Sequence, residues 1–87
     1  MRVSKDKTMK LFLLILGCKP AGRNTEQHDT FFGIGNSLAD LLPQIKQFWP
    51  DCGKVHIDSW REVTAVDGFT IQVLASHIFF KVVRNSL

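Results

Sequence analysis

Two stretches near the start of the chain have apolar patterns that predict neighbouring β-strands. Residues 11–16 read LFLLIL, apolar at every position, which is typical of a strand covered on both faces. A polar, turn-forming segment follows at residues 19–24, and residues 29–34 resume the apolar pattern with Phe31 and Phe32. We therefore expect a hairpin with a long loop, in which the first strand is central to the sheet.

A helix is predicted after this hairpin. Ser37 is a good N-cap, and Asp40 would lie in the first turn. The apolar residues that follow recur at helical spacing and predict one buried stripe: Leu38, Leu41, Leu42, Ile45, Phe48 and Trp49. Pro43 conflicts with this pattern, because proline inside a helix removes a hydrogen bond and clashes with the preceding turn. Either the helix kinks, or a first turn gives way to a helix that restarts at Pro43.

The rest of the chain predicts a second hairpin. Residues 55–66 alternate, so Val55 and Ile57 would face the helix while His56, Asp58 and Trp60 would share the other face. The dipeptide Asp67-Gly68 is a strong hairpin signal, and residues 69–73 alternate again. These elements predict a small α+β domain of ββαββ order, with a mixed or antiparallel sheet and one helix packed on one face.

The excess positive charge lies in the N-terminal part of the chain. The net charge of +3 is already present in the first ten residues, where Asp6 accompanies four basic residues: Arg2, Lys5, Lys7 and Lys10. We assign residues 1–8 to a basic N-terminal extension, 9–75 to the single domain, and 76–87 to a C-terminal strand or tail. A neutral domain lacks the basic face that nucleic-acid binding requires, so no nucleic-acid partner is expected.

Cysteine usage and the apolar run bear on location. Gly17-Cys18 after the apolar run resembles a lipoprotein processing site, but six residues are fewer than the roughly 7–15 of a signal-peptide core or the roughly 20 of a membrane span. We therefore expect a cytoplasmic protein with no membrane partner. Cys18 and Cys52 lack the spacing of a zinc framework, and we treat both as buried free thiols, although a bridge between them is possible.

Several short motifs resemble a known family. They are KLFL at residues 10–13, HD at 28–29, HIDSWREV at 56–63 and VDGF at 66–69. They are similar to the bacterial family called domain of unknown function fifteen forty-three, over about residues 9–74. The resemblance implies a cytoplasmic bacterial α+β domain and no established activity. Longer members look as if they carry a second, related half.

Four residues are candidates for chemistry: His28, Asp29, His56 and Asp58, with Glu26 as a further candidate. Two imidazoles with two carboxylates form a ligand set for Zn²⁺, and an imidazole beside a carboxylate can act as a general base. The structural alternative is favoured, in which these residues shape a turn and pair across the sheet. We assign no catalytic residue, metal or cofactor. We do expect His28 and His56 to begin adjacent, parallel strands at one edge of the sheet.

One helix can cover only one face of the sheet. On the central strand, Phe12, Leu14 and Leu16 lie on one face, and three further apolar residues lie on the other, namely Leu11, Leu13 and Ile15. The face that the helix leaves open therefore needs another partner. The remaining ligand or interface candidates are Trp60, Glu62 and Phe12. We therefore expect either an oligomerising interaction module, most simply a homodimer, or a ligand-binding module. The alternative is a small metal-assisted or acid/base enzyme that uses the His-Asp pairs.

Overall fold

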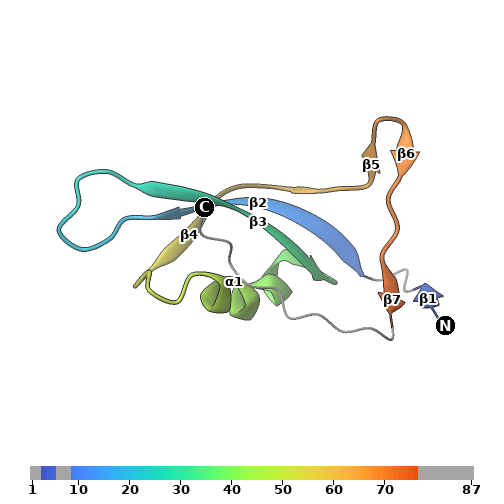
Figure 1. Ribbon diagram of the computed structural model, residues 1–87, viewed down its shortest axis with the longest axis horizontal. Helices are drawn as coiled ribbons and strands as arrows, with labels where there is room; N and C mark the ends of the chain where they lie inside the picture. The colour runs from blue at the N-terminus through green and yellow to red at the C-terminus, as the bar shows by residue number, and fades with distance from the viewer. Residues whose placement is uncertain (1–2, 6–8, 77–87) are drawn as a thin grey trace.

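A three-stranded antiparallel sheet with helices on one face forms the centre of the molecule. The computed structural model describes residues 3–5 and 9–76 (Figure 1). The sheet contains β2 (Lys10–Cys18), β3 (Gln27–Gly35) and β4 (Val55–Glu62), in the order β3-β2-β4. β3 and β4 are each antiparallel to β2 and therefore parallel to each other. The predicted α+β class and the central position of the first apolar strand are confirmed.

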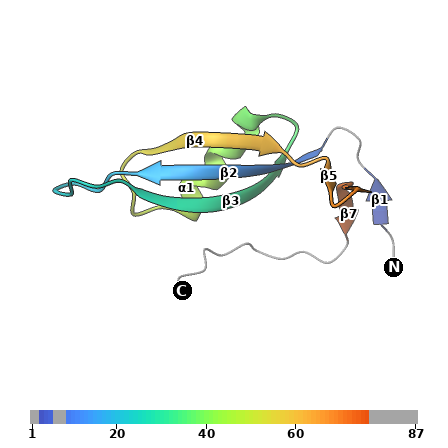
Figure 2. The same ribbon diagram turned by 90° about the horizontal axis from the view of Figure 1, so that it is seen from above.

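The core lies between β2 and the helices. Alternate residues of β2 are buried on this side: Phe12, Leu14, Leu16 and Cys18. They pack with Phe31 of β3 and with Leu41, Ile45 and Trp49 of the helical segment. Leu11, Leu13 and Ile15 lie on the other side of β2 and are only half-buried. No described element covers that side (Figures 1 and 2), so the expectation that both faces of this strand are covered is wrong for the described part of the chain.

The helical segment begins with a short 3₁₀ turn. This turn, η1 (Leu38–Leu41), leads directly into α1 (Leu42–Phe48), where Pro43 occupies the first turn. Proline is well placed there because the first backbone N–H groups of a helix have no partner within the helix. The second of the two predicted forms is therefore confirmed. The Ser37 side chain makes no capping hydrogen bond; instead, the Asp40 carboxylate accepts one from the Asn36 backbone N–H at 3.0 Å.

A disulfide joins the end of β2 to the segment after α1. It links Cys18 and Cys52, which are 34 positions apart and have Cα atoms separated by 6.1 Å. The expectation of two free thiols is therefore wrong. Spacing along the chain could not show that the end of β2 and the end of the helix meet on the same side of the sheet.

The second hairpin lies outside the main sheet. β5 (Ala65–Val66) pairs only with β6 (Phe69–Thr70), through a turn in which Asp67 and Gly68 have φ values of 52° and 82°. The hairpin turn at this dipeptide is confirmed, but the four-stranded sheet implied by ββαββ order is not formed. The hairpin projects from the end of the sheet, on the side away from α1 (Figure 1).

The ends of the described chain form a further small pair. β1 (Val3–Lys5) is antiparallel to β7 (Leu74–Ser76). Beyond Ser76, the predicted C-terminal strand or tail lies outside the described residues. Among the helices that are described, none has the length and apolar character needed to cross a membrane.

Candidate functional site

An irregularity in β4 decides which of its side chains share a face. Ile15 lies opposite Ser59 and Leu16 opposite Ile57, so Asp58 is an extra residue in the ladder. Such a β-bulge reverses the alternation beyond it. His56 lies opposite Gly17 and shares the open face with Asp58, whereas Trp60 lies opposite Leu14 on the helix side. The prediction that Trp60 shares a face with His56 is therefore wrong.

The two histidines occupy matching positions on the outer strands. His28 of β3 and His56 of β4 both lie opposite Gly17 of β2. Their strands begin at the same end of the sheet, as predicted from a crossover helix, but they are not adjacent, because β2 lies between them. The two imidazoles can approach across β2 because Gly17 has no side chain.

Two carboxylates join the imidazoles into one cluster. His28 Nε2 lies 2.9 Å from Glu26 Oε1 and 2.6 Å from Asp58 Oδ2. His56 Nε2 lies 2.7 Å from Glu26 Oε2 and 3.1 Å from Asp58 Oδ1. Each carboxylate thus offers one oxygen to each imidazole. We call Glu26, His28, His56 and Asp58 the His-carboxylate cluster; its side chains are 30–50% exposed.

Gly17 provides the space under the His-carboxylate cluster. A Cβ atom at this position would lie 2.6 Å from His56 Nε2, 2.8 Å from Glu26 Oε1 and 3.0 Å from Asp58 Oδ2. These separations are shorter than ordinary van der Waals contacts, so any side chain at residue 17 would displace the cluster. The cluster therefore depends on Gly17 of β2, a strand that contributes none of the cluster's polar groups.

Four short N–O contacts converge on two imidazole nitrogens. An imidazole Nε2 carries at most one hydrogen, so two imidazoles supply at most two hydrogens to the four short N–O contacts. A cation at the centre would instead accept a lone pair from every one of these groups. Glu26, His28 and Asp58 each offer a ligand atom, and these three atoms lie within 4.8 Å of one another.

Asp29 does not belong to the cluster, although it follows His28 directly. It lies opposite Leu16 and so faces the helix side, where its Oδ1 accepts a hydrogen bond from the Thr30 backbone N–H at 3.0 Å. Glu26, which lies just before β3, provides the carboxylate instead. The sequence signal for Glu26 is its spacing of two from His28, the same spacing that joins His56 to Asp58.

Comparison with known proteins identifies the family of the chain. A family model described as Domain of Unknown Function (DUF1543) matches residues 23–73, which include all four cluster residues. The chain belongs to this family. The resemblance inferred from the sequence motifs is confirmed to that extent. No curated protein and no solved structure matches the chain.

The other candidate residues of this DUF1543 chain lie on the helix side of the sheet. Phe12 is buried in the core, and its ring forms a T-shaped contact with the Trp60 ring at a centroid distance of 6.1 Å. Trp60 is half exposed, and Glu62 lies opposite Phe12 on the same face. These three residues form one neighbourhood that is separated from the His-carboxylate cluster by the sheet itself.

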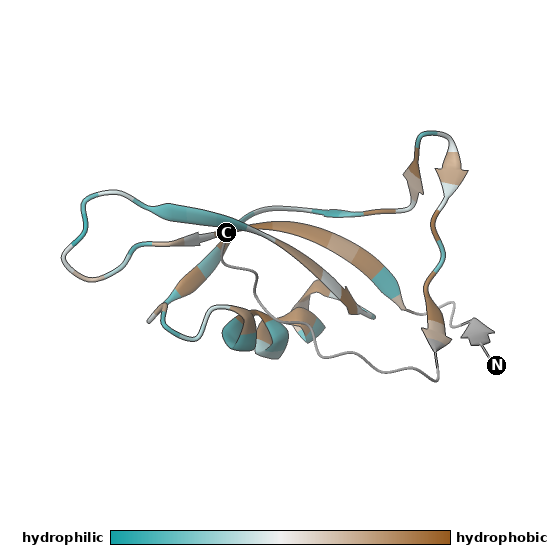
Figure 3. Cartoon of the chain, viewed as in Figure 1, coloured by the Kyte–Doolittle hydropathy of each residue, from teal (hydrophilic) through white to brown (hydrophobic). Residues whose placement is uncertain are grey.

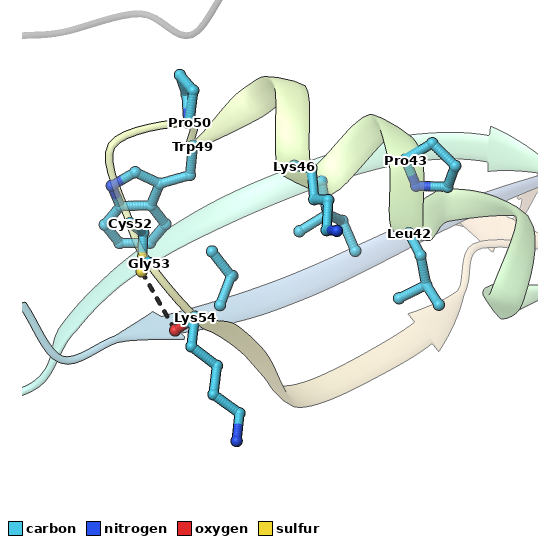
Figure 4. A pocket seen from close by; sticks show the side chains of 10 residues that line it. Leu42, Pro43, Lys46, Trp49, Pro50, Cys52, Gly53 and Lys54 are labelled. Carbon is cyan, nitrogen blue, oxygen red and sulfur yellow. Dashed lines mark hydrogen bonds between the residues drawn. The ribbon is translucent and has the colours of Figure 1, made fainter.

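A groove runs between α1 and the start of β4 (Figure 4). Its lining is mostly apolar, with Leu42 and Trp49 from the helical segment and Val55 from β4, and with two lysines, Lys46 and Lys54. None of the candidate site residues predicted from the sequence lines it. Cys52 does, and its sulfur lies 3.2 Å from the Lys54 carbonyl oxygen. In this DUF1543 chain, the polar chemistry is therefore on the open face of the sheet and not in the groove.

Proposed function

We propose that this DUF1543 domain is a ligand-binding module whose ligand is a divalent transition metal ion of the Zn²⁺ type. The ligand atoms are Nε2 of His28 and His56 and one oxygen each of Glu26 and Asp58. The observation that carries the proposal is the convergence of all four groups above Gly17, from the ends of two strands that are not neighbours.

The donor set selects the class of metal. Imidazole nitrogen suits Zn²⁺, Cu²⁺, Ni²⁺ and Fe²⁺, whereas Mg²⁺ and Ca²⁺ prefer oxygen ligands alone. A tetrahedral ion with bonds of about 2.1 Å separates its ligand atoms by about 3.4 Å. The N–O separations in the cluster are 2.6–3.1 Å, so these pairs need to move apart by only a few tenths of an ångström. His56 is not among the residues whose ligand atoms lie within 4.8 Å of one another, so its imidazole also has to turn toward the other three groups. These are movements that exposed side chains can make.

Four protein ligands favour a site that holds its ion over one that performs chemistry, because a tetrahedral shell is then complete. The second candidate is metal-assisted or acid/base catalysis at the same place. It is favoured by the group of three ligands formed by Glu26, His28 and Asp58, since catalytic zinc sites have three protein ligands and one open position. His56 would then be available as a general base.

Metal titration tests the proposal. The untagged protein is freed of metal with a chelator, dialysed without reductant so that Cys18 and Cys52 stay joined, and titrated with Zn²⁺ or Co²⁺ in competition with a chromophoric chelator. We expect one ion per chain with a micromolar or lower Kd, and no competition from millimolar Mg²⁺ or Ca²⁺. Absence of Zn²⁺ binding at 100 µM protein would disprove the proposal.

Two aspartates provide a matched pair of variants. Asp58→Asn removes a proposed ligand, and we expect the Kd for Zn²⁺ to rise by at least about 10-fold to 100-fold. Asp29→Asn makes the same chemical change on the helix side and should leave the Kd within about twofold. If both variants bind Zn²⁺ as the wild type does, the ion is held elsewhere.

A further inference from the structure

The open face of the sheet carries a continuous apolar surface beside the His-carboxylate cluster. Leu11, Leu13 and Ile15 of β2 form its centre. Phe32 and Ile34 of β3 lie next to them, opposite Leu13 and Leu11, with 58% and 43% of their surfaces exposed. The brown stretch of β2 and the teal start of β3 in Figure 3 show this division along the sheet. We call this surface the open apolar face.

Charge on this side of the sheet is unevenly placed. The cluster puts the carboxylates of Glu26 and Asp58 at the end marked by Gly17. Arg61 is opposite Leu13, and outside the cluster it is the one charged residue that the three described strands direct to the open side. Leu13 and Gly17 are four residues apart on β2, so the positive and negative groups are about 13 Å apart along the strands.

We propose that the open apolar face binds a second copy of this chain, in a two-fold dimer whose axis passes near Ile15. Ile15 lies midway between Leu13 and Gly17. A two-fold axis across the strands at this residue therefore turns the position of each onto the position of the other. Arg61 then lies over the partner's His56, beside the Asp58 carboxylate that contacts this imidazole, and the same contact is repeated across the axis, as an isologous interface requires.

The same symmetry buries the most exposed aromatic residue of the sheet. Phe32 is opposite Leu13 and His28 is opposite Gly17, both on β3. The axis therefore places Phe32 over the partner's His28, while the aliphatic residues of both β2 strands fill the centre. Apolar burial and opposite charges thus favour one arrangement, and a copy of the chain supplies both.

The area of the face sets the expected affinity. Nine residues of β2 give a length of about 30 Å, and three strands give a width of about 14 Å, so each copy contributes roughly 400 Å². Stable interfaces bury about 800 Å² per partner. The hairpin projects on the same side and adds exposed apolar residues, Val66 and Phe69. We therefore expect a dimer that dissociates in the micromolar range.

Sedimentation velocity from 1 to 200 µM tests this proposal. Wild-type protein is expected to shift from monomer to dimer across the range, and Phe32→Glu is expected to remain monomeric. Leu42→Glu is the matched control, since Leu42 is 53% exposed on the helix side. A monomeric wild type at 200 µM, a dimeric Phe32→Glu variant or a monomeric Leu42→Glu variant would each overturn the proposal.

Reversal of charge tests the register and does not depend on Phe32. Arg61→Glu should raise the dimer Kd by about 10-fold or more, and the double variant Arg61→Glu/Asp58→Arg should restore at least part of the loss. No recovery in the double variant would show that Arg61 and Asp58 do not meet across the axis. All samples are measured with EDTA and with Zn²⁺. A dimer that forms in both, without Zn²⁺ binding, would contradict the proposed function and leave this inference intact.

Discussion

Gly17 provides the most specific residue-scale test of the metal site, because it contributes space and no ligand atom. Gly17→Ala places a methyl group 2.6 Å from the position of His56 Nε2. We expect the cluster to be displaced and the Kd for Zn²⁺ to rise by at least about 10-fold, by analogy with residues that orient metal ligands. The measurement is the competition titration described above, with circular dichroism to confirm that the variant folds.

Gly53→Ala is the control for this variant. A Cβ atom at Gly53 meets no atom within 4 Å, and no positive φ is required there. The Kd of the Gly53→Ala variant for Zn²⁺ should equal that of the wild type. Unchanged Zn²⁺ binding by Gly17→Ala would mean that the ion is not held above residue 17.

At the residue scale, the sequence predicted part of the cluster. His56 and Asp58 could be placed on one face, because a spacing of two keeps side chains together on a strand. Asp29 could not be excluded, since it is adjacent to His28 and only the register shows that it faces Leu16. The side of the sheet on which Trp60 lies depends on a bulge that no glycine or proline in the sequence marks.

At the scale of elements, the disulfide is the connection most open to experiment. Cys18–Cys52 closes a loop of 34 positions between β2 and the segment after α1. Closure of a loop this long is worth about 3–4 kcal/mol in the chain-entropy account. We expect reduction to lower the free energy of unfolding by about 2–4 kcal/mol, measured by urea denaturation with and without dithiothreitol.

The double variant Cys18→Ala/Cys52→Ala controls for other effects of the reductant. Its urea midpoint should be the same in both conditions and close to that of the reduced wild type. Equal midpoints for oxidised and reduced wild type would show that the bond contributes nothing to stability. Because disulfides persist chiefly in oxidising compartments, the bond does not support the cytoplasmic location, which stays a prediction.

The elements themselves were largely predictable. Each has a local signal, such as the apolar run in β2, the turn at Asp67-Gly68 and the proline in the first turn of α1. The disulfide has no local signal, because it depends on how α1 returns the chain to the end of β2. The isolation of the second hairpin also depends on how the elements pack in three dimensions, so the sequence could not show that β5 pairs only with β6.

At the scale of the whole molecule, metal binding should raise the free energy of unfolding. The proposed ligands come from β3 and β4, which belong to one sheet only in the folded chain, so the ion binds the folded state preferentially. Free Zn²⁺ at about 100 times its Kd should then raise the free energy of unfolding by about 2.7 kcal/mol. Urea denaturation with Zn²⁺ and with EDTA measures this difference.

The same measurement on Asp58→Asn provides the contrast. This variant should unfold at nearly the same urea concentration with and without Zn²⁺, whereas Asp29→Asn should gain as much stability as the wild type. Equal stabilisation of all three proteins would point to an ion bound away from the cluster.

The β-bulge at Asp58 has a consequence for the evolution of the chain. Loss of one residue of β4 other than Asp58 or Ser59 would turn one part of the strand over, so that polar groups enter the core or core residues leave it. Loss of either of these two would instead remove the bulge, but loss of Asp58 would also remove a carboxylate of the His-carboxylate cluster, whereas loss of Ser59 would not. Asp58 would move opposite Ile15, Trp60 would stay opposite Leu14, and both parts of the strand would keep their faces. An alignment of homologous chains should therefore tolerate a one-residue gap at position 59 more readily than anywhere else in this strand.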